Sequence, residues 1–79
     1  MVQKNVNLVS LGKKIRGIRE DQGYSQDGFA LEAGLDRTYY AGIERGERNP
    51  AALNIIKIAK TLGVEVGDLF PKIRALKKS

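Results

Sequence analysis

Four glycines punctuate this chain, and each follows a short segment whose apolar residues recur at helical spacing. Gly23, Gly34, Gly46 and Gly63 stand where helices commonly end, because glycine tolerates the left-handed backbone of a helix C-terminus. No segment alternates apolar and polar residues for long enough to predict a strand. The sequence therefore predicts an all-α fold, a compact bundle of five short helices joined by tight turns.

The expected helices follow from this division. The first has an apolar stripe at spacings of three and four, which is typical of an amphipathic helix. Side chains that accept hydrogen bonds from backbone N–H groups precede the first three segments and are expected to cap them. The predicted helices cover residues 8–22, 25–34, 37–45, 51–62 and 64–70, and the predicted caps are Asn7, Ser25 and Asp36.

The chain has 79 residues, enough for one small domain. We expect a flexible N-terminus over residues 1–7, the folded domain over 8–70, and a basic tail over 71–79 because Pro71 breaks the last helix. No apolar run approaches the roughly 20 residues of a membrane span, and residues 1–9 lack the apolar stretch of a signal peptide. We therefore expect a cytoplasmic protein without a membrane partner.

The composition excludes several kinds of chemistry. There is no cysteine and no histidine, so thiolate metal ligands, the commonest metal ligand and the commonest general base are all missing. No carboxylate cluster or phosphate-binding glycine loop compensates. We expect no enzyme activity, no metal, no cofactor and no small-molecule ligand. The net charge of +5 favours a polyanionic partner, although a generic basic protein would carry the same charge.

The segment 51–62 has more apolar surface than a helix of a small domain needs. Its apolar residues spread over more than half of the helical circumference, whereas an arc of roughly 100° usually suffices. We expect the surplus, Ile55 or Ile58, to lie at a homodimer interface; alternatively, the first or the fifth helix covers it. Dimerisation would also stabilise so small a core.

Residues 26–45, QDGFALEAGLDRTYYAGIER, have the pattern of two short helices joined by a tight turn at Gly34. Ala30 permits a close helix crossing, and Leu35, Tyr40 and Ile43 are placed to face the core. This pattern is typical of a helix-turn-helix motif, whose second helix turns its polar side outwards.

From IRGIREDQGYSQ through LDRTYYAGIERGERNP to IIKIAKTLGVEVGDLF, the chain resembles the lambda-repressor-like helix-turn-helix family, the Cro and phage-repressor type. Within that family, LDRTYYAGIERGERNP is similar to the controller proteins of restriction–modification systems. The resemblance implies a sequence-specific regulator of transcription that binds double-stranded DNA as a homodimer on a palindromic operator. A phage-type repressor, an antitoxin, and a helical protein-interaction module that does not read DNA remain alternatives.

The resemblance also assigns roles to polar residues around the recognition helix, residues 37–45. Its first turn is expected to read bases, since the N-terminal residues of such a helix reach base edges and arginine can bind guanine through two hydrogen bonds. The expected base-reading residues are Arg37, Thr38 and Tyr39. The residues expected at the DNA backbone, the last two of which could also reach bases, are Gln26, Arg45, Arg48 and Asn49.

Other positions concern the support of this helix. Arg19 and Glu44 match a pair that forms a structural salt bridge in the family. Gly42 has no side chain where relatives often carry a reading residue, so base readout is expected to concentrate in the first turn. Ala51 follows Pro50 where relatives often place a Ser or Thr cap, so either Asn49 caps the next helix or that helix begins loosely.

Overall fold

The computed structural model describes residues 4–78, and the predicted all-α architecture is confirmed within them. A 3-10 helix, η1, stands where the fifth helix was expected, and a second 3-10 helix, η2, follows in the basic tail. Residues 1–3 of the predicted N-terminal segment and residue 79 of the tail lie outside the described residues. The elements are α1 (Val6–Asp21), α2 (Gln26–Ala33), α3 (Arg37–Arg45), α4 (Ala52–Leu62), η1 (Val66–Leu69) and η2 (Ile73–Ala75).

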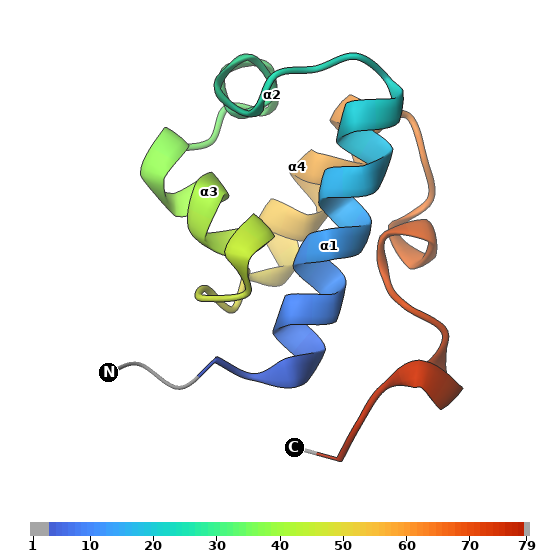
Figure 1. The fold of residues 1–79 in the computed structure, drawn as a ribbon. Coiled ribbons are helices and arrows are strands. Elements are labelled where there is room, and N and C mark those ends of the chain that lie inside the picture. The colour runs from blue at the N-terminus through green and yellow to red at the C-terminus, as the bar shows by residue number, and fades with distance from the viewer. Residues whose placement is uncertain (1–3, 79) are drawn as a thin grey trace.

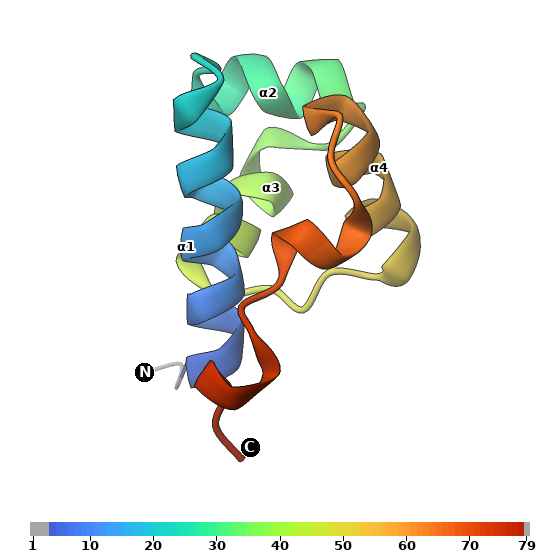
Figure 2. The same ribbon diagram turned by 90° about the vertical axis from the view of Figure 1, so that its right-hand side faces the viewer.

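The helices surround one small core. Helices α1 and α4 form two sides, α2 crosses one end of the bundle, and α3 closes the remaining side (Figure 1). In the view turned by 90°, the C-terminal segment runs between α1 and α4 and ends beside the start of α1 (Figure 2). The core consists of Leu11, Ile15, Phe29, Ala30, Ala33, Tyr40, Ile43, Ile55, Ile58, Ala59, Leu62 and Leu69. No helix among residues 4–78 is both long and apolar enough to span a membrane.

The helix ends follow the local chemistry of the sequence. Ser25 and Asp36 cap α2 and α3 as predicted, by accepting hydrogen bonds from the backbone N–H groups of Gly28 and Tyr39 at 3.0 and 2.9 Å. Helices α2, α3 and α4 all end at a glycine in the left-handed conformation. Helix α4 begins at Ala52, and its N-cap residue is Ala51, which provides no side-chain hydrogen bond, so Asn49 does not take that role.

The structure corrects the predicted N-terminal cap of α1. The helix begins at Val6, earlier than predicted, and Asn5 rather than Asn7 caps it. Asn5 has the extended backbone of a cap, and its Oδ1 accepts from the N–H groups of Asn7 and Leu8 at 2.9 and 3.2 Å. The amide of Asn7 instead pairs with the backbone of Lys77, donating to its carbonyl at 2.5 Å and accepting from its N–H at 2.7 Å. This pairing fastens the tail to the first turn of α1.

The structure also corrects which apolar residues of α4 face outwards. Ile55 and Ile58 are 6% and 0% exposed, so both belong to the core of a single chain and neither is the surplus apolar residue. The large exposed apolar side chains of this helix are Leu53 and Ile56, at 64% and 43%. The surplus predicted for α4 exists, but helical periodicity alone does not say which neighbouring elements cover which part of the circumference.

Helices α1 and α3 approach each other closely at Gly12. A Cβ atom at this position would lie 2.5 Å from the backbone oxygen of Glu44, and it would also overlap the backbone oxygen of Ile43. Backbone atoms of a packed helix cannot move aside as the end of a long side chain can. Glycine at position 12 therefore sets how near α3 lies to α1.

We predict opposite effects for one substitution at two glycines of α1. Gly12→Ala should lower the free energy of unfolding by about 1 to 3 kcal/mol, because the new methyl group overlaps the backbone of α3. Gly17→Ala should raise it by about 0.5 to 1 kcal/mol, since Gly17 has nothing within 4 Å of its added Cβ and alanine favours the helix. Urea denaturation at one protein concentration measures both, and equal effects would contradict the close approach.

Candidate nucleic-acid interface

A buried ion pair connects α1 to the end of α3. The guanidinium of Arg19 donates two hydrogen bonds to the carboxylate of Glu44, from Nε to Oε2 at 2.7 Å and from Nη2 to Oε1 at 3.0 Å. Its Nη1 donates to the backbone oxygen of Tyr24 at 2.8 Å, so the guanidinium also supports the turn that leads into α2. Arg19 and Glu44 thus form the salt bridge that the resemblance implies, and it holds α3 in place.

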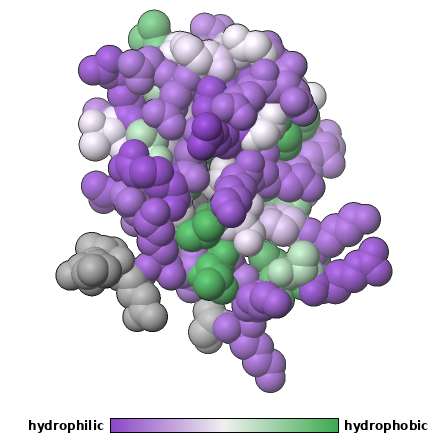
Figure 3. Space-filling model, viewed as in Figure 1, coloured by the Kyte–Doolittle hydropathy of each residue, from purple (hydrophilic) through white to green (hydrophobic). Residues whose placement is uncertain are grey.

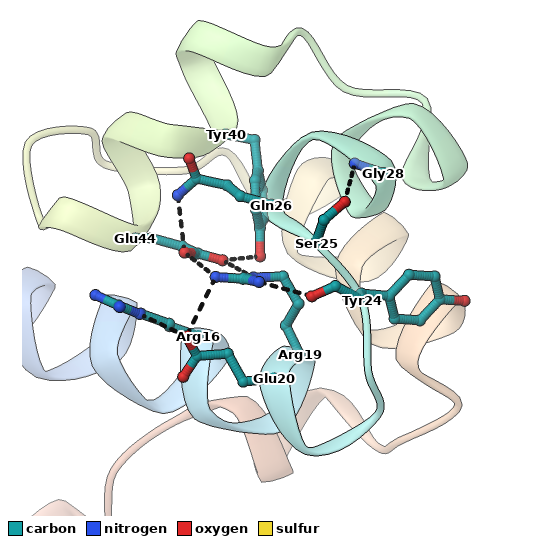
Figure 4. Close-up of polar contacts among 9 residues, drawn as sticks. All are labelled: Arg16, Arg19, Glu20, Tyr24, Ser25, Gln26, Gly28, Tyr40 and Glu44. Atoms are coloured by element: carbon teal, nitrogen blue, oxygen red, sulfur yellow. Dashed lines mark hydrogen bonds and ion pairs between the residues drawn. The ribbon is translucent and has the colours of Figure 1, made fainter.

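Two further side chains complete the hydrogen bonding of this carboxylate (Figure 4). The hydroxyl of Tyr40 donates to Glu44 Oε2, and the amide of Gln26 donates to Oε1 at 3.0 Å. Among the described residues, no buried side-chain nitrogen or oxygen lacks a partner. Glu44 therefore joins α1, α2 and α3 at a single point.

The cluster shifts the ionisation of its members. Burial alone would raise the pKa of Glu44, but the hydrogen bonds from Arg19, Tyr40 and Gln26 outweigh it and lower the pKa from 4.5. The hydrogen bond to Glu44 raises the pKa of Arg19 against the opposing effect of burial. Burial, followed by the hydrogen bond to Glu44, raises the pKa of Tyr40. At neutral pH the cluster is a charged pair beside a neutral phenol.

The opposite side of α3 faces outwards and is polar. Arg37, Thr38, Ala41 and Arg45 share one side of the helix and line an open hollow together with Asp27 of α2. Hydrophilic side chains cover most of the surface over α3, whereas hydrophobic ones gather near the start of α1 (Figure 3). This outer face has the shape and chemistry that a helix entering a groove of DNA requires.

The arginines of this face are held in weak, exposed ion pairs. Arg37 Nη1 lies 3.2 Å from Asp27 Oδ2, and both side chains are about two-thirds exposed. Arg45 Nε donates to Glu47 Oε1 at 3.1 Å, and Arg45 Nη2 lies 3.0 Å from the same oxygen. Exposed pairs of this kind contribute little to stability, because water screens them, so both guanidinium groups can exchange their carboxylate for another acceptor. Asp27 was not predicted as a partner, because only the turn between α2 and α3 brings it near Arg37.

Tyr39 lies apart from the other two predicted base-reading residues. It is half-buried against α4, and its hydroxyl oxygen accepts a hydrogen bond from Asn54 Nδ2 at 3.0 Å. Because the oxygen is the acceptor, the O–H of Tyr39 stays free to donate to a phosphate. Asn54 is a polar residue within the apolar run of α4, and that was the only signal in the sequence for its role.

Three more residues were predicted to contact the DNA backbone, and their surroundings differ: Gln26 begins α2, whereas Arg48 and Asn49 follow α3. Gln26 uses one N–H of its amide for Glu44, which leaves the second N–H for a phosphate. Asn49 is exposed in the segment between α3 and α4. Arg48, in the same segment, lies over Gly42, where a Cβ would come within 2.6 Å of the Arg48 Cγ. Position 42 has no side chain of its own, but it is covered by the side chain of Arg48.

A short helix held from behind by a buried ion pair, with a basic outer face and a preceding helix across its back, defines a helix-turn-helix DNA-binding domain. The helix-turn-helix family profile matches residues 15–69. The chain belongs to the lambda-repressor-like helix-turn-helix family of DNA-binding transcription regulators.

Within this family the chain is similar to controller proteins, as predicted. It is 47% identical over 67 residues to the control protein C.BamHI of Bacillus amyloliquefaciens, covering 84% of this chain and 82% of that one. It is 39% identical over 66 residues to the control protein C.MunI of a Mycoplasma species, covering 82% and 89%. The crystal structure of the restriction-modification controller protein C.AhdI from Aeromonas hydrophila matches with a TM-score of 0.80 at 43% identity, over 82% of this chain and 98% of that chain. These relatives are regulators rather than enzymes.

We predict that the Glu44 cluster makes stability depend on acid. The pKa of Glu44 is lower in the folded protein than in the unfolded one, so its contribution is present above pH 4.5 and is lost as the pH falls through the folded pKa. Glu44→Gln should lower the free energy of unfolding at pH 7 by about 3 to 5 kcal/mol, because it leaves the buried Arg19 charge with only the exposed carboxylate of Glu20, 3.9 Å from its Nη2. Urea denaturation across pH 3 to 7 should show the difference from wild type shrinking as the pH falls.

The matched control is Glu20→Gln, which removes a carboxylate that also lies 3.9 Å from Arg19 but forms its closer pair with Arg16, at 3.1 Å on the surface of α1. Its effect should stay below about 1 kcal/mol at every pH, because the pair is exposed. Equal effects of the two substitutions at pH 7 would contradict the role given to Glu44.

Proposed function

We propose that this protein is a sequence-specific regulator of transcription that binds double-stranded DNA as a homodimer on a palindromic operator, and that it controls a restriction–modification system. The observation that carries the proposal is the outer face of α3, where Arg37, Thr38 and Arg45 are presented on a helix fixed by the buried Arg19–Glu44 pair. Similarity to the control proteins C.BamHI and C.MunI supports the narrower assignment.

The proposed readout begins at Arg37. On binding, its guanidinium exchanges the exposed carboxylate of Asp27 for O6 and N7 of a guanine in the major groove. The loss of one surface pair costs little, whereas the two parallel hydrogen bonds to guanine are strong and directional. Thr38, beside it on the same face, offers a hydroxyl to a base and a methyl group to thymine.

Contacts to phosphates would hold the helix in register. The second N–H of Gln26 and the O–H of Tyr39 are donors near the two edges of α3, and Arg45 adds a positive charge on its outer face. Such contacts position a protein on the duplex without selecting a sequence. They also release counter-ions, so affinity should fall steeply as the salt concentration rises.

The homodimer would form through an apolar groove on another side of the molecule. The groove lies between α1, α4 and η1, where Ile56, Val66 and Phe70 remain substantially exposed although they are large and apolar. A second copy packed there would bury Ile56, one of the two large exposed apolar side chains of α4, and would leave both α3 helices free. With one recognition helix per half-site, the half-sites would repeat at about one helical turn, roughly 10 base pairs. The groove is lined by Leu8, Leu11, Asn49, Pro50, Ala52, Ile55, Ile56, Val66 and Phe70.

We predict that selection of bound duplexes from a random pool yields a symmetric site. On that site Arg37→Ala should weaken binding by about 1 to 3 kcal/mol and relax the preference at one base pair of each half-site. The reason is that arginine makes the two hydrogen bonds that distinguish guanine from the other bases. Fluorescence anisotropy with the selected duplex and its single-base variants measures both effects.

Arg16→Ala is the matched control, since Arg16 is an exposed arginine whose partner, Glu20, lies on its own helix. It should change affinity little and specificity not at all. Failure to enrich any duplex, or equal losses for both substitutions on every sequence, would overturn the assignment and favour a helical module that binds proteins.

A further inference from the structure

The outer face of α3 contains a position without a side chain of its own. Gly42 stands one helical turn after Thr38, next to the residues that line the polar hollow, yet it is buried. What buries it is the side chain of Arg48: a Cβ on Gly42 would lie 2.6 Å from Cγ, 3.6 Å from Cδ and 3.5 Å from Nε of that arginine. The Arg48 stem therefore lies along the helix in the space that a residue-42 side chain would fill.

The turn after α3 places Arg48 there. Gly46 has a φ of 77°, a left-handed conformation that turns the chain back along the helix. The backbone N–H groups of Glu47 and Arg48 then both donate to the carbonyl oxygen of Gly42, at 2.9 and 3.3 Å. Arg48 is thereby fixed opposite Gly42 by its own backbone, and only the absence of a Cβ atom lets its side chain lie flat.

Arg48 also differs from the neighbouring arginines in having no carboxylate paired with it. Arg37 and Arg45 each have a carboxylate at ion-pair distance, Asp27 and Glu47 respectively. Within residues 4–78, no carboxylate lies at ion-pair distance from Arg48. An arginine held against a DNA-facing helix without a counter-ion is available to an external anion or to a base acceptor.

We propose that Gly42 is a positioning residue for Arg48. By lacking a Cβ, it seats the Arg48 side chain on the outer face of α3, so that a residue from outside the helix supplies the DNA contact that position 42 itself does not make. The inference rests on the proposed function, because its ligand is the major groove of a duplex. It assigns glycine at this position a role in DNA affinity and not only in the fold.

The substitution Gly42→Ala tests this with effects of opposite sign. Alanine favours a helix over glycine, so the variant should be no less stable in urea denaturation, provided that the exposed Arg48 side chain moves aside. Its affinity for the selected duplex should nevertheless fall on the order of tenfold or more, as for the loss of one good arginine contact. Arg48→Ala should cause a similar loss, and the double variant should bind no more weakly than Arg48→Ala.

Gly17→Ala serves as control, because it is the same change at an exposed position within a helix and should leave affinity unchanged. Additive losses, or wild-type affinity in Gly42→Ala, would overturn the proposal. If Gly42→Ala proved unstable, Arg48→Ala alone would still decide, since unchanged affinity in that variant contradicts the inference. If Arg37→Ala lost affinity for the duplex while Gly42→Ala and Arg48→Ala kept it, the proposed function would stand and only this inference would be wrong.

Discussion

The salt bridge between Arg19 and Glu44 determines where α3 sits, and the rest of the molecule depends on that placement. A buried carboxylate is costly unless its oxygens are paired. Here three side chains, one each from α1, α2 and α3, donate hydrogen bonds to the carboxylate of Glu44. Each donor comes from a different helix, so none of the three helices can shift without breaking a bond to Glu44. Gly12 adds a steric condition, because it lets α1 approach the backbone of α3 at the same end.

This constraint on the inner side of α3 leaves its outer side free for recognition. The helix has only nine residues, and such a helix is barely stable in isolation. Fixed from behind, it presents Arg37, Thr38 and Arg45 on one face, and Arg48 reaches the same helix from the following turn. The ion pairs of Arg37 and Arg45 on that face are exposed and can exchange partners, whereas the Arg19–Glu44 pair on the inner side is buried. Burial thus separates the residues that support the helix from those available to a ligand.

Much of the fold was predictable because its signals are local. The caps at Ser25 and Asp36 and the glycines that end α2, α3 and α4 depend on chemistry within a few residues. The errors concern partners that are distant in the sequence. Periodicity showed that α4 is apolar on too many sides, but it could not show that Ile56, and not Ile55 or Ile58, is the exposed isoleucine, because that depends on how α2 and η1 pack against the helix. The predicted cap Asn7 is instead engaged by the backbone of Lys77, 70 residues further along the chain, and Asn5 caps the helix.

The candidate site shows the same division. A base-reading role for Arg37 could be proposed from the motif, since a first-turn arginine on an outward face can bind guanine through two hydrogen bonds. The pairing of Tyr39 with Asn54, and the seating of Arg48 on Gly42, arise from side chains that meet only in the folded chain. The most direct measurement of the account is a crystal structure of the protein with its selected duplex. It should show two copies about a two-fold axis, each α3 in the major groove, Arg37 in hydrogen-bond contact with a base edge and Arg19–Glu44 intact. A complex in which the outer face of α3 points away from the DNA would contradict the account.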